Sequence, residues 1–167
     1  MNKYLLTAAL LLAARLLHAQ PVPQDTAIHT GHLANGLTYY IRYNAEPKKK
    51  VVMYLVNKAG SILEDDDQQG LAHFMEHMNF NGTRHYPKNK LEDFLQRAGV
   101  RFGADLNAYT SYDETVYQLP LPLDNPSMLY KGLDILHDWT QFARLTTADI
   151  EQERGVVLEE ERLGLGA

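Results

Sequence analysis

Two histidines and a glutamate stand at a spacing that suits metal-assisted hydrolysis. His73, Glu76 and His77 form an H-x-x-E-H pattern. In a helix, residues four apart lie on one face, so both imidazoles can reach one cation. Zinc accepts imidazole and carboxylate ligands, and a site with three protein ligands keeps a fourth position for water. The pattern therefore predicts a zinc site in which Glu76 takes a proton from the attacking water.

Two histidines leave a third protein ligand to be found, and the last predicted helix, Thr147 to Leu163, offers several carboxylates. The candidates for the third ligand in this helix are Glu151, Glu153, Glu159, Glu160 and Glu161. Glu153 and Glu160 share one helix face with Val157 between them. A solvated acidic face is the usual interpretation of such a run. A stripe that includes a valine instead predicts partial burial, where carboxylates need partners. From the residues alone, Glu159, Glu160 and Glu161 remain alternatives.

Composition excludes several other classes of protein. The chain has 167 residues, which favours one domain, and its 45% hydrophobic and 22% charged residues are typical of a globular protein. It contains no cysteine, which excludes disulfide scaffolds, thiol catalysis and cysteine-ligated metal sites. A net charge of −5 argues against a general nucleic-acid-binding surface.

The N-terminus has the pattern of a secretion signal. Lys3 precedes an apolar run from Tyr4 to Leu17, and Ala19 is a small residue at a plausible cleavage position. The run is too short for a membrane-spanning helix. We therefore expect residues 1–20 to be a signal peptide and the rest to be exported to the periplasm or secreted, with no stable membrane anchor.

The remaining pattern predicts an α+β fold, an antiparallel-rich sheet packed against helices, and not a doubly wound parallel sheet. After a polar leader at residues 21–32, strands are expected at 37–43 and 51–56, paired as a hairpin. The motif helix is expected at 68–79, with Leu71, Met75 and Met78 toward the core and the acidic run at 64–67 capping its start. The other expected elements are a helix at 88–98, paired strands at 103–109 and 114–119, a linker at 120–126, and helices at 127–143 and 147–163 with Thr147 as N-cap.

Two segments resemble the pitrilysin/insulinase family of zinc metallopeptidases, whose catalytic signature is H-x-x-E-H. They are Gly70–Met78 and Glu153–Glu160, and the resemblance extends from about His29 to the end of the chain. It implies the fold of the N-terminal domain of mitochondrial-processing-peptidase-like metallohydrolases.

The resemblance also implies the roles of the site residues. One zinc ion per chain would be held by His73, His77 and Glu160, with Glu76 as the general base and Glu153 as a supporting carboxylate behind the ligands. The family thereby favours Glu160 among the alternatives that the residues left open.

A further segment, Asn107–Thr110 followed by Asp113–Tyr117, resembles the family's strand to which a peptide adds as an extra strand. The resemblance implies that Asn107 and Ala108 bind substrate beside the scissile bond. A simple buried hairpin is the alternative for these side chains.

The family's working unit is a clamshell of homologous domains. We therefore expect residues 21–167 to be an N-terminal zinc metallopeptidase domain truncated at its C-terminal end, with weak or no activity alone. The expected function is zinc-dependent endopeptidase activity on extended peptides or unfolded proteins. The expected partners are the missing C-terminal domains or a homologous subunit.

A non-catalytic peptide-binding or partner subunit is the alternative, although loss of the motif would be expected there. S-ribosylhomocysteinase, which also carries H-x-x-E-H, is excluded because it needs a catalytic cysteine.

Overall fold

The computed structural model describes residues 22–88, 90–101 and 107–164. These residues belong to two compact units, 1–45 and 46–167, which are described separately below. The expected signal peptide and most of the expected strand at 103–109 lie outside the described residues. Within the described part, no helix has the length and hydropathy needed to cross a membrane.

The first unit contains an antiparallel hairpin of β1 (Ile28–His32) and β2 (Thr38–Arg42). The turn between them has Gly36 at φ 90°, and the Leu37 amide donates to Asn35 Oδ1 at 3.1 Å. The expected hairpin between residues 37–43 and 51–56 is wrong, because β2 pairs with β1. The expectation of a polar leader without a strand at 21–32 is also wrong, because β1 lies within it. The Asn-Gly turn closes the hairpin toward the N-terminal side, and the short β1 was hidden among polar residues.

The second unit contains a three-stranded antiparallel sheet in the order β3 (Lys50–Asn57), β5 (Thr115–Pro122), β4 (Asn107–Thr110). The expected pairing of the last two strands is confirmed. The expected linker is wrong at its start, because β5 continues to Pro122 opposite Lys50. Pro120 and Pro122 of β5 lie past Gln118, where the pairing with β4 ends. Among the described strands this part of β5 pairs with β3 alone, so the missing proline N–H groups interrupt no hydrogen bond to β4.

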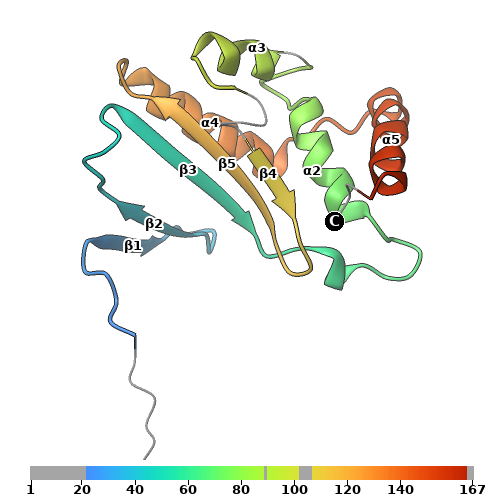
Figure 1. Ribbon diagram of the computed structural model, residues 1–167, viewed down its shortest axis with the longest axis horizontal. Coiled ribbons are helices and arrows are strands. Elements are labelled where there is room, and N and C mark those ends of the chain that lie inside the picture. Colours follow the sequence, from blue (N-terminus) through green and yellow to red (C-terminus); the bar gives the residue numbers. More distant parts are fainter. Residues whose placement is uncertain (1–21, 89, 102–106, 165–167) are drawn as a thin grey trace, which may run out of the picture. The chain divides into compact units, whose positions relative to one another are not determined.

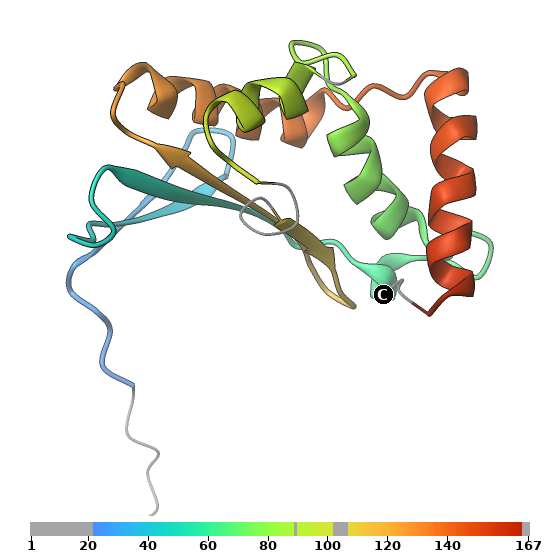
Figure 2. The ribbon, with the colours of Figure 1, turned by 45° about the horizontal axis from the view of Figure 1, so that its top comes forward.

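Helix α4 (Ser127–Gln141) covers one face of this sheet, and α3 (Lys90–Arg97) closes the same core. The core residues alternate along β3, where Met53 and Leu55 are buried while Val52, Tyr54 and Val56 are exposed. The other core members are Leu91, Leu95, Val100, Tyr117, Leu119, Leu121, Ile135 and Trp139. Figures 1 and 2 show α4 lying along β5.

Gly132 allows α4 to approach the sheet closely. A Cβ at this position would stand 2.7 Å from Leu121 Cδ1 and 2.9 Å from Met53 Cε. Both distances are too short for real carbon contacts, so with a larger residue here the ends of the Leu121 and Met53 side chains would have to move. Close packing here fixes the height of α4 above β3 and β5.

The motif helix is α2 (Leu71–Asn81), preceded by the short 3₁₀ helix η1 (Ser61–Leu63). Its start is capped by Glu64, whose carboxylate accepts from the Gly70 and Ala72 amides at 2.8 and 2.7 Å. Met78 is fully buried as expected, whereas Leu71 and Met75 are 51% and 38% exposed and do not belong to the core.

Helix α5 (Thr147–Arg162) lies beside α2 in both ribbon views (Figures 1 and 2). Its N-cap is Thr146, whose hydroxyl accepts from the Asp149 amide, so the expected Thr147 cap is wrong by one residue. The two helices and the sheet together confirm the predicted α+β fold, an antiparallel sheet packed against helices.

Candidate metal centre

Three donor atoms converge between α2 and α5. His73 Nε2 and His77 Nε2 are 3.2 Å apart, and Glu160 Oε2 lies 3.5 Å from the first and 3.2 Å from the second. The two histidines come from one face of α2, four residues apart as the motif predicts, and the glutamate comes from the facing turn of α5. All three residues are partly buried. This is a candidate metal site.

The separations fit a tetrahedral zinc ion. Nitrogen and oxygen ligands lie about 2.0–2.1 Å from zinc, so two ligands of a tetrahedron are about 3.3–3.4 Å apart. The three distances between the donor atoms, 3.2, 3.2 and 3.5 Å, bracket that value. Two imidazoles and one carboxylate are also a donor set that zinc accepts.

The hydrogen bond behind His77 sets which ring nitrogen faces the centre. His77 Nδ1 lies 2.9 Å from Glu153 Oε1, and both side chains are under a fifth exposed. An ionised carboxylate only accepts, so Nδ1–H donates to it. In the neutral ring Nε2 then presents its lone pair toward His73 and Glu160. Two acceptor atoms, this nitrogen and Glu160 Oε2, therefore face one point, where a cation would stabilise them.

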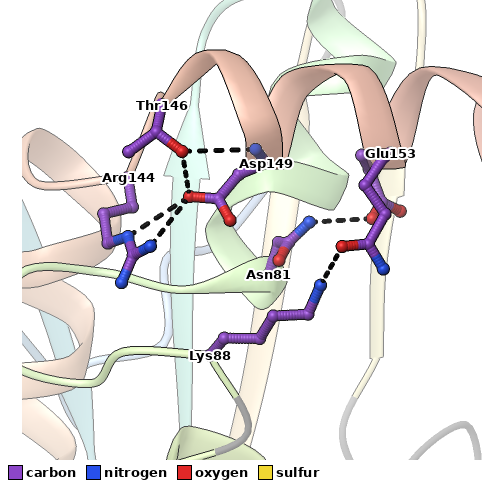
Figure 3. A network of polar contacts seen from close by, with 7 residues as sticks. Asn81, Lys88, Arg144, Thr146, Asp149 and Glu153 are labelled. Atoms are coloured by element: carbon purple, nitrogen blue, oxygen red, sulfur yellow. Dashed lines mark hydrogen bonds and ion pairs between the residues drawn. The ribbon is translucent and has the colours of Figure 1, made fainter.

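Glu153 is itself held by a second residue of α2. Asn81 Nδ2 donates to Glu153 Oε2 at 2.9 Å, so that both oxygens of the carboxylate have a partner on the motif helix. Figure 3 shows Asn81 and Glu153 meeting between the two helices. This arrangement fixes the carboxylate and, through it, the orientation of the His77 ring.

The start of α5 is anchored by a further set of polar contacts, drawn in Figure 3. Arg144 Nη2 lies 3.1 Å from Asp149 Oδ2, and the Thr146 hydroxyl donates to the same oxygen at 2.6 Å. The Thr146 hydrogen bond is the main cause that lowers the pKa of Asp149, and Arg144 adds to it. One turn further on, Lys88 Nζ donates to Gln152 Oε1 at 2.6 Å. These contacts place the turn that carries Glu153.

Glu76 lies on α2 beside the ligands and is not among the three converging donors. Its Oε2 accepts a hydrogen bond from the Thr110 hydroxyl at 2.6 Å. Together with His77 it lines a cavity of about 320 Å³, whose other walls are Phe80, Asn81, Lys88, Glu92, Gln152 and Glu153. The motif glutamate thus borders an open volume next to the candidate metal site.

Tyr117 of β5 lies close enough to Glu76 for their charges to interact. Burial raises the pKa of its phenol to about 12, and the negative charge of Glu76 contributes to the rise. Its oxygen accepts from Asn79 Nδ2 at 2.8 Å. The phenol therefore stays neutral across the physiological range and packs as part of the core.

The expected substrate strand is β4, which lies at one edge of the described sheet. Asn107 is exposed and its Oδ1 accepts from the Ala108 amide, whereas Ala108 is partly buried. Because side chains alternate along a strand, Ala108 shares the α2-facing side with Thr110, and Asn107 points to the opposite side. The side chains of Asn107 and Ala108 therefore lie on opposite sides of the strand, and what the two residues share at the edge is their backbone N–H and C=O groups.

Two residues that contact the site were missed from the sequence. Asn81 could have been found, because it stands four residues after His77 on the same face of α2. Thr110 belongs to the segment expected to bind substrate, but its contact with Glu76 carried no sequence signal, since it depends on the register of β4 on β5 and on the packing of α2 against β4.

Comparison with known proteins assigns the chain to a family. The model of the family "Insulinase (Peptidase family M16)" matches residues 40–162. The chain is 46% identical over 157 residues to the probable zinc protease PqqL of Escherichia coli (strain K12), covering 94% of this chain and 17% of that protein. It is 34% identical over 142 residues to the chloroplastic stromal processing peptidase of Pisum sativum, covering 83% of this chain and 10% of that protein. It spans less than a fifth of the length of either relative.

The fold agrees with a solved structure of the same kind. The first half of the periplasmic protease PqqL from Escherichia coli superposes with a TM-score of 0.80 at 44% identity, over 87% of this chain and 31% of that one. The match confirms the expected resemblance to the N-terminal portion of such enzymes. The chain is a homologue of zinc proteases with a His-His-Glu candidate site, and it belongs to the insulinase family of peptidases, M16.

Proposed function

We propose that this chain supplies the zinc-binding catalytic part of an endopeptidase that hydrolyses extended peptides. The observation that carries the proposal is the convergence of His73, His77 and Glu160 donor atoms at tetrahedral separations. The position of Glu76 at the wall of the adjoining cavity supports it, as does the homology to probable zinc proteases.

Each residue of the site has a proposed role. His73, His77 and Glu160 hold the ion, and Glu153 fixes the tautomer of His77. Zinc bound there would lower the pKa of a water molecule and polarise the scissile carbonyl. Glu76 accepts the proton of the attacking water and passes it to the departing amine.

The edge of β4 is the proposed site of substrate binding. Its outer N–H and C=O groups can pair with an extended peptide, which would run beside Asn107 and Ala108. Main-chain pairing tolerates many sequences, so the proposed substrates are peptides and unfolded proteins. Because the relatives are several times longer, we propose that further domains or a homologous subunit close over the bound peptide.

We further propose that the protein is exported to the periplasm. Residues 1–20 have the composition of a signal peptide. The similar PqqL structure is of a periplasmic protease. Detection of a mature N-terminus near residue 21 in a periplasmic fraction would test the export, and an uncleaved chain in the cytoplasm would contradict it.

The metal content of the purified chain tests the site directly. We expect about one zinc per chain, and a clear loss in Glu160→Gln, measured by elemental analysis after dialysis. Glu161→Gln is the matched control, because Glu161 is the next residue of α5 and is exposed. Absence of zinc in the parent, or equal loss in both variants, would contradict the proposed ligands.

Hydrolysis of a fluorogenic unfolded-protein substrate tests the reaction. Glu76→Gln should keep zinc and lose the cleavage that the parent shows, because the amide cannot accept the proton. Cleavage that survives in Glu76→Gln would refute the proposed base. Zinc binding without cleavage by the parent would agree with the weak or absent activity expected of the chain alone, and the same comparison of parent and Glu76→Gln would then be made with the further domains present.

A further inference from the structure

We infer that Thr110 is a positioning residue for Glu76, through a hydrogen bond that reaches from the substrate-edge strand to the proposed base. This inference rests on the proposed function, because it concerns the orientation of the carboxylate that takes the proton. Nothing in the H-x-x-E-H pattern assigns a role to this threonine.

The contact is short and partly buried. Thr110 Oγ1 lies 2.6 Å from Glu76 Oε2, and Thr110 is only 8% exposed. A hydroxyl has one proton to donate, and a carboxylate can only accept, so the direction of the bond is fixed from Thr110 to Glu76. Hydrogen bonds to a charged acceptor are shorter and stronger than neutral ones, as this distance indicates.

Both ends of the bond are held by rigid elements. Thr110 is β-branched, which restricts its χ1 angle, and it is in register opposite Thr115 in the β4–β5 ladder. Glu76 stands in the middle of α2, which packs against β4 (Figure 1). A glutamate without a partner would sample several rotamers, so the bond selects one of them.

The choice of oxygen matters for the reaction. The Thr110 hydroxyl is bound to Oε2 and leaves the lone pairs of Oε1 free of this contact. We infer that Oε1 is the oxygen presented to the attacking water. Because β4 also carries the backbone edge at Asn107 and Ala108, one strand would align both the peptide and the base.

Cobalt(II) in place of zinc provides a readout that does not depend on turnover, since its visible absorption changes with the surroundings of the ion. The variants are Thr110→Val, which keeps the shape and removes the hydroxyl, and Thr110→Ser, which restores the hydroxyl. Thr115→Val is the matched control: Thr115 is equally buried, pairs with Thr110, and donates to the Ala59 carbonyl at 2.9 Å, away from Glu76.

We expect every variant of the full chain to bind one cobalt ion. Thr110→Val should shift the absorption in the same direction as Glu76→Gln, whereas Thr110→Ser and Thr115→Val should keep the parent spectrum. A parent-like spectrum for Thr110→Val, or an equal shift in Thr115→Val, would overturn the inference. A parent that binds no cobalt would overturn the proposed metal site and the inference together.

The zinc-loaded forms give a second, kinetic test. Since general-base catalysis contributes about 10²–10⁴-fold, misdirecting the base should lower kcat by roughly tenfold or more while KM stays nearly unchanged. Thr110→Ser should recover most of kcat. A raised KM with unchanged kcat would instead assign Thr110 to peptide binding and would overturn its role in positioning Glu76.

Discussion

At the scale of single residues, the site depends on groups that do not themselves face its centre. His77 presents Nε2 inward because its Nδ1–H is bound to Glu153, and Glu153 is held in turn by Asn81. Such partners behind a ligand commonly account for 10–100-fold, to order of magnitude, in metal affinity. The strength of zinc binding should therefore depend on residues outside the three proposed ligands.

Glu153→Gln tests this dependence. The amide is a weaker acceptor for the His77 N–H and removes a negative charge near the ion, so zinc affinity should fall by roughly 10–100-fold. Competition with a chromophoric chelator measures the change. The control is Glu151→Gln, which lies on the exposed side of α5 paired with Arg154 and should leave the affinity within about twofold. Equal affinities in both variants would show that Glu153 does not support the site.

The site shows where single-residue reasoning succeeds and where it stops. The spacing of His73 and His77 requires only a helix, and the stripe of Glu153, Val157 and Glu160 was expected to be partly buried, as all three are. Thr110 was not predictable, because its partner is 34 residues away in the sequence. Local periodicity gives the face of an element, whereas a contact between elements depends on tertiary packing.

At the scale of elements, the entrance to α2 is held by a remote carboxylate. Glu64 accepts from the Gly70 and Ala72 amides, which are free donors at the helix start, and its charge faces the positive end of the helix dipole. The acidic run at 64–67 was expected to cap this helix, and the structure assigns that contact to its first member. The orientation of the motif helix is thereby linked to the loop before it.

Replacement of Glu64 by alanine should therefore destabilise the chain. Losing a cap of this kind costs about 1 kcal/mol in the free energy of unfolding, which chemical denaturation followed by circular dichroism can measure. Asp66→Ala, in the same run but exposed, is the control and should change stability by less than about 0.5 kcal/mol. If both variants lose the same stability, net charge and not capping would be the cause.

Helix α4 is tied to the loop after α2 by a buried carboxylate. Asp138 is 1% exposed and accepts from Thr83 Oγ1 at 2.5 Å and from His85 Nδ1 at 2.7 Å. Burial alone would raise the pKa of Asp138, but the hydrogen bonds from Thr83 and His85 hold it below its ordinary value. The folded state thus favours the ionised form more than the unfolded chain does.

The sign of the resulting pH dependence follows from linkage. A carboxyl whose pKa is lowered by folding adds stability above its unfolded pKa, about 3.9, and this stability is lost as the pH falls through the folded pKa. The free energy of unfolding should therefore decline below about pH 4 in the parent. Asp138→Asn should be less stable at neutral pH and decline less steeply on acidification. Parallel pH profiles for the two proteins would contradict this account.

The pairing of strands was the least predictable feature at this scale. Residues 37–43 and 51–56 both read as strands and are neighbours in the sequence, so a hairpin between them was the simplest expectation. The structure pairs the first with β1 and the second with β5, more than 50 residues away. β-propensity identifies a strand, but it does not identify its partner, which is chosen by tertiary packing.

At the scale of the whole molecule, the candidate metal site joins helices α2 and α5, whose contact buries no residue of α5 fully. Helix α5 contains no fully buried residue between Thr147 and Arg162. Its links to α2 are polar: the Glu160 pairs with His73 and His77, and the Glu153 pairs with His77 and Asn81. A cation between the histidines and Glu160 would add a strong link to these hydrogen bonds. Zinc should therefore support the docking of α5 as well as the chemistry.

Removal of zinc should act on this interface and leave the β1–β2 hairpin unchanged. Binding to the folded state alone adds about 2.7 kcal/mol of stability when free zinc is 100 times its Kd. Chelation should lower the melting temperature accordingly and speed amide hydrogen exchange in α5 and α2. The hairpin, which belongs to the other compact unit, should exchange at the same rate with and without zinc. Glu160→Gln should have the same melting temperature with zinc and after chelation, because it lacks the α5 ligand that would join the ion to α2. If chelation changed exchange equally everywhere, or if Glu160→Gln kept the full response to zinc, the ion would not be what holds α5 against the motif helix.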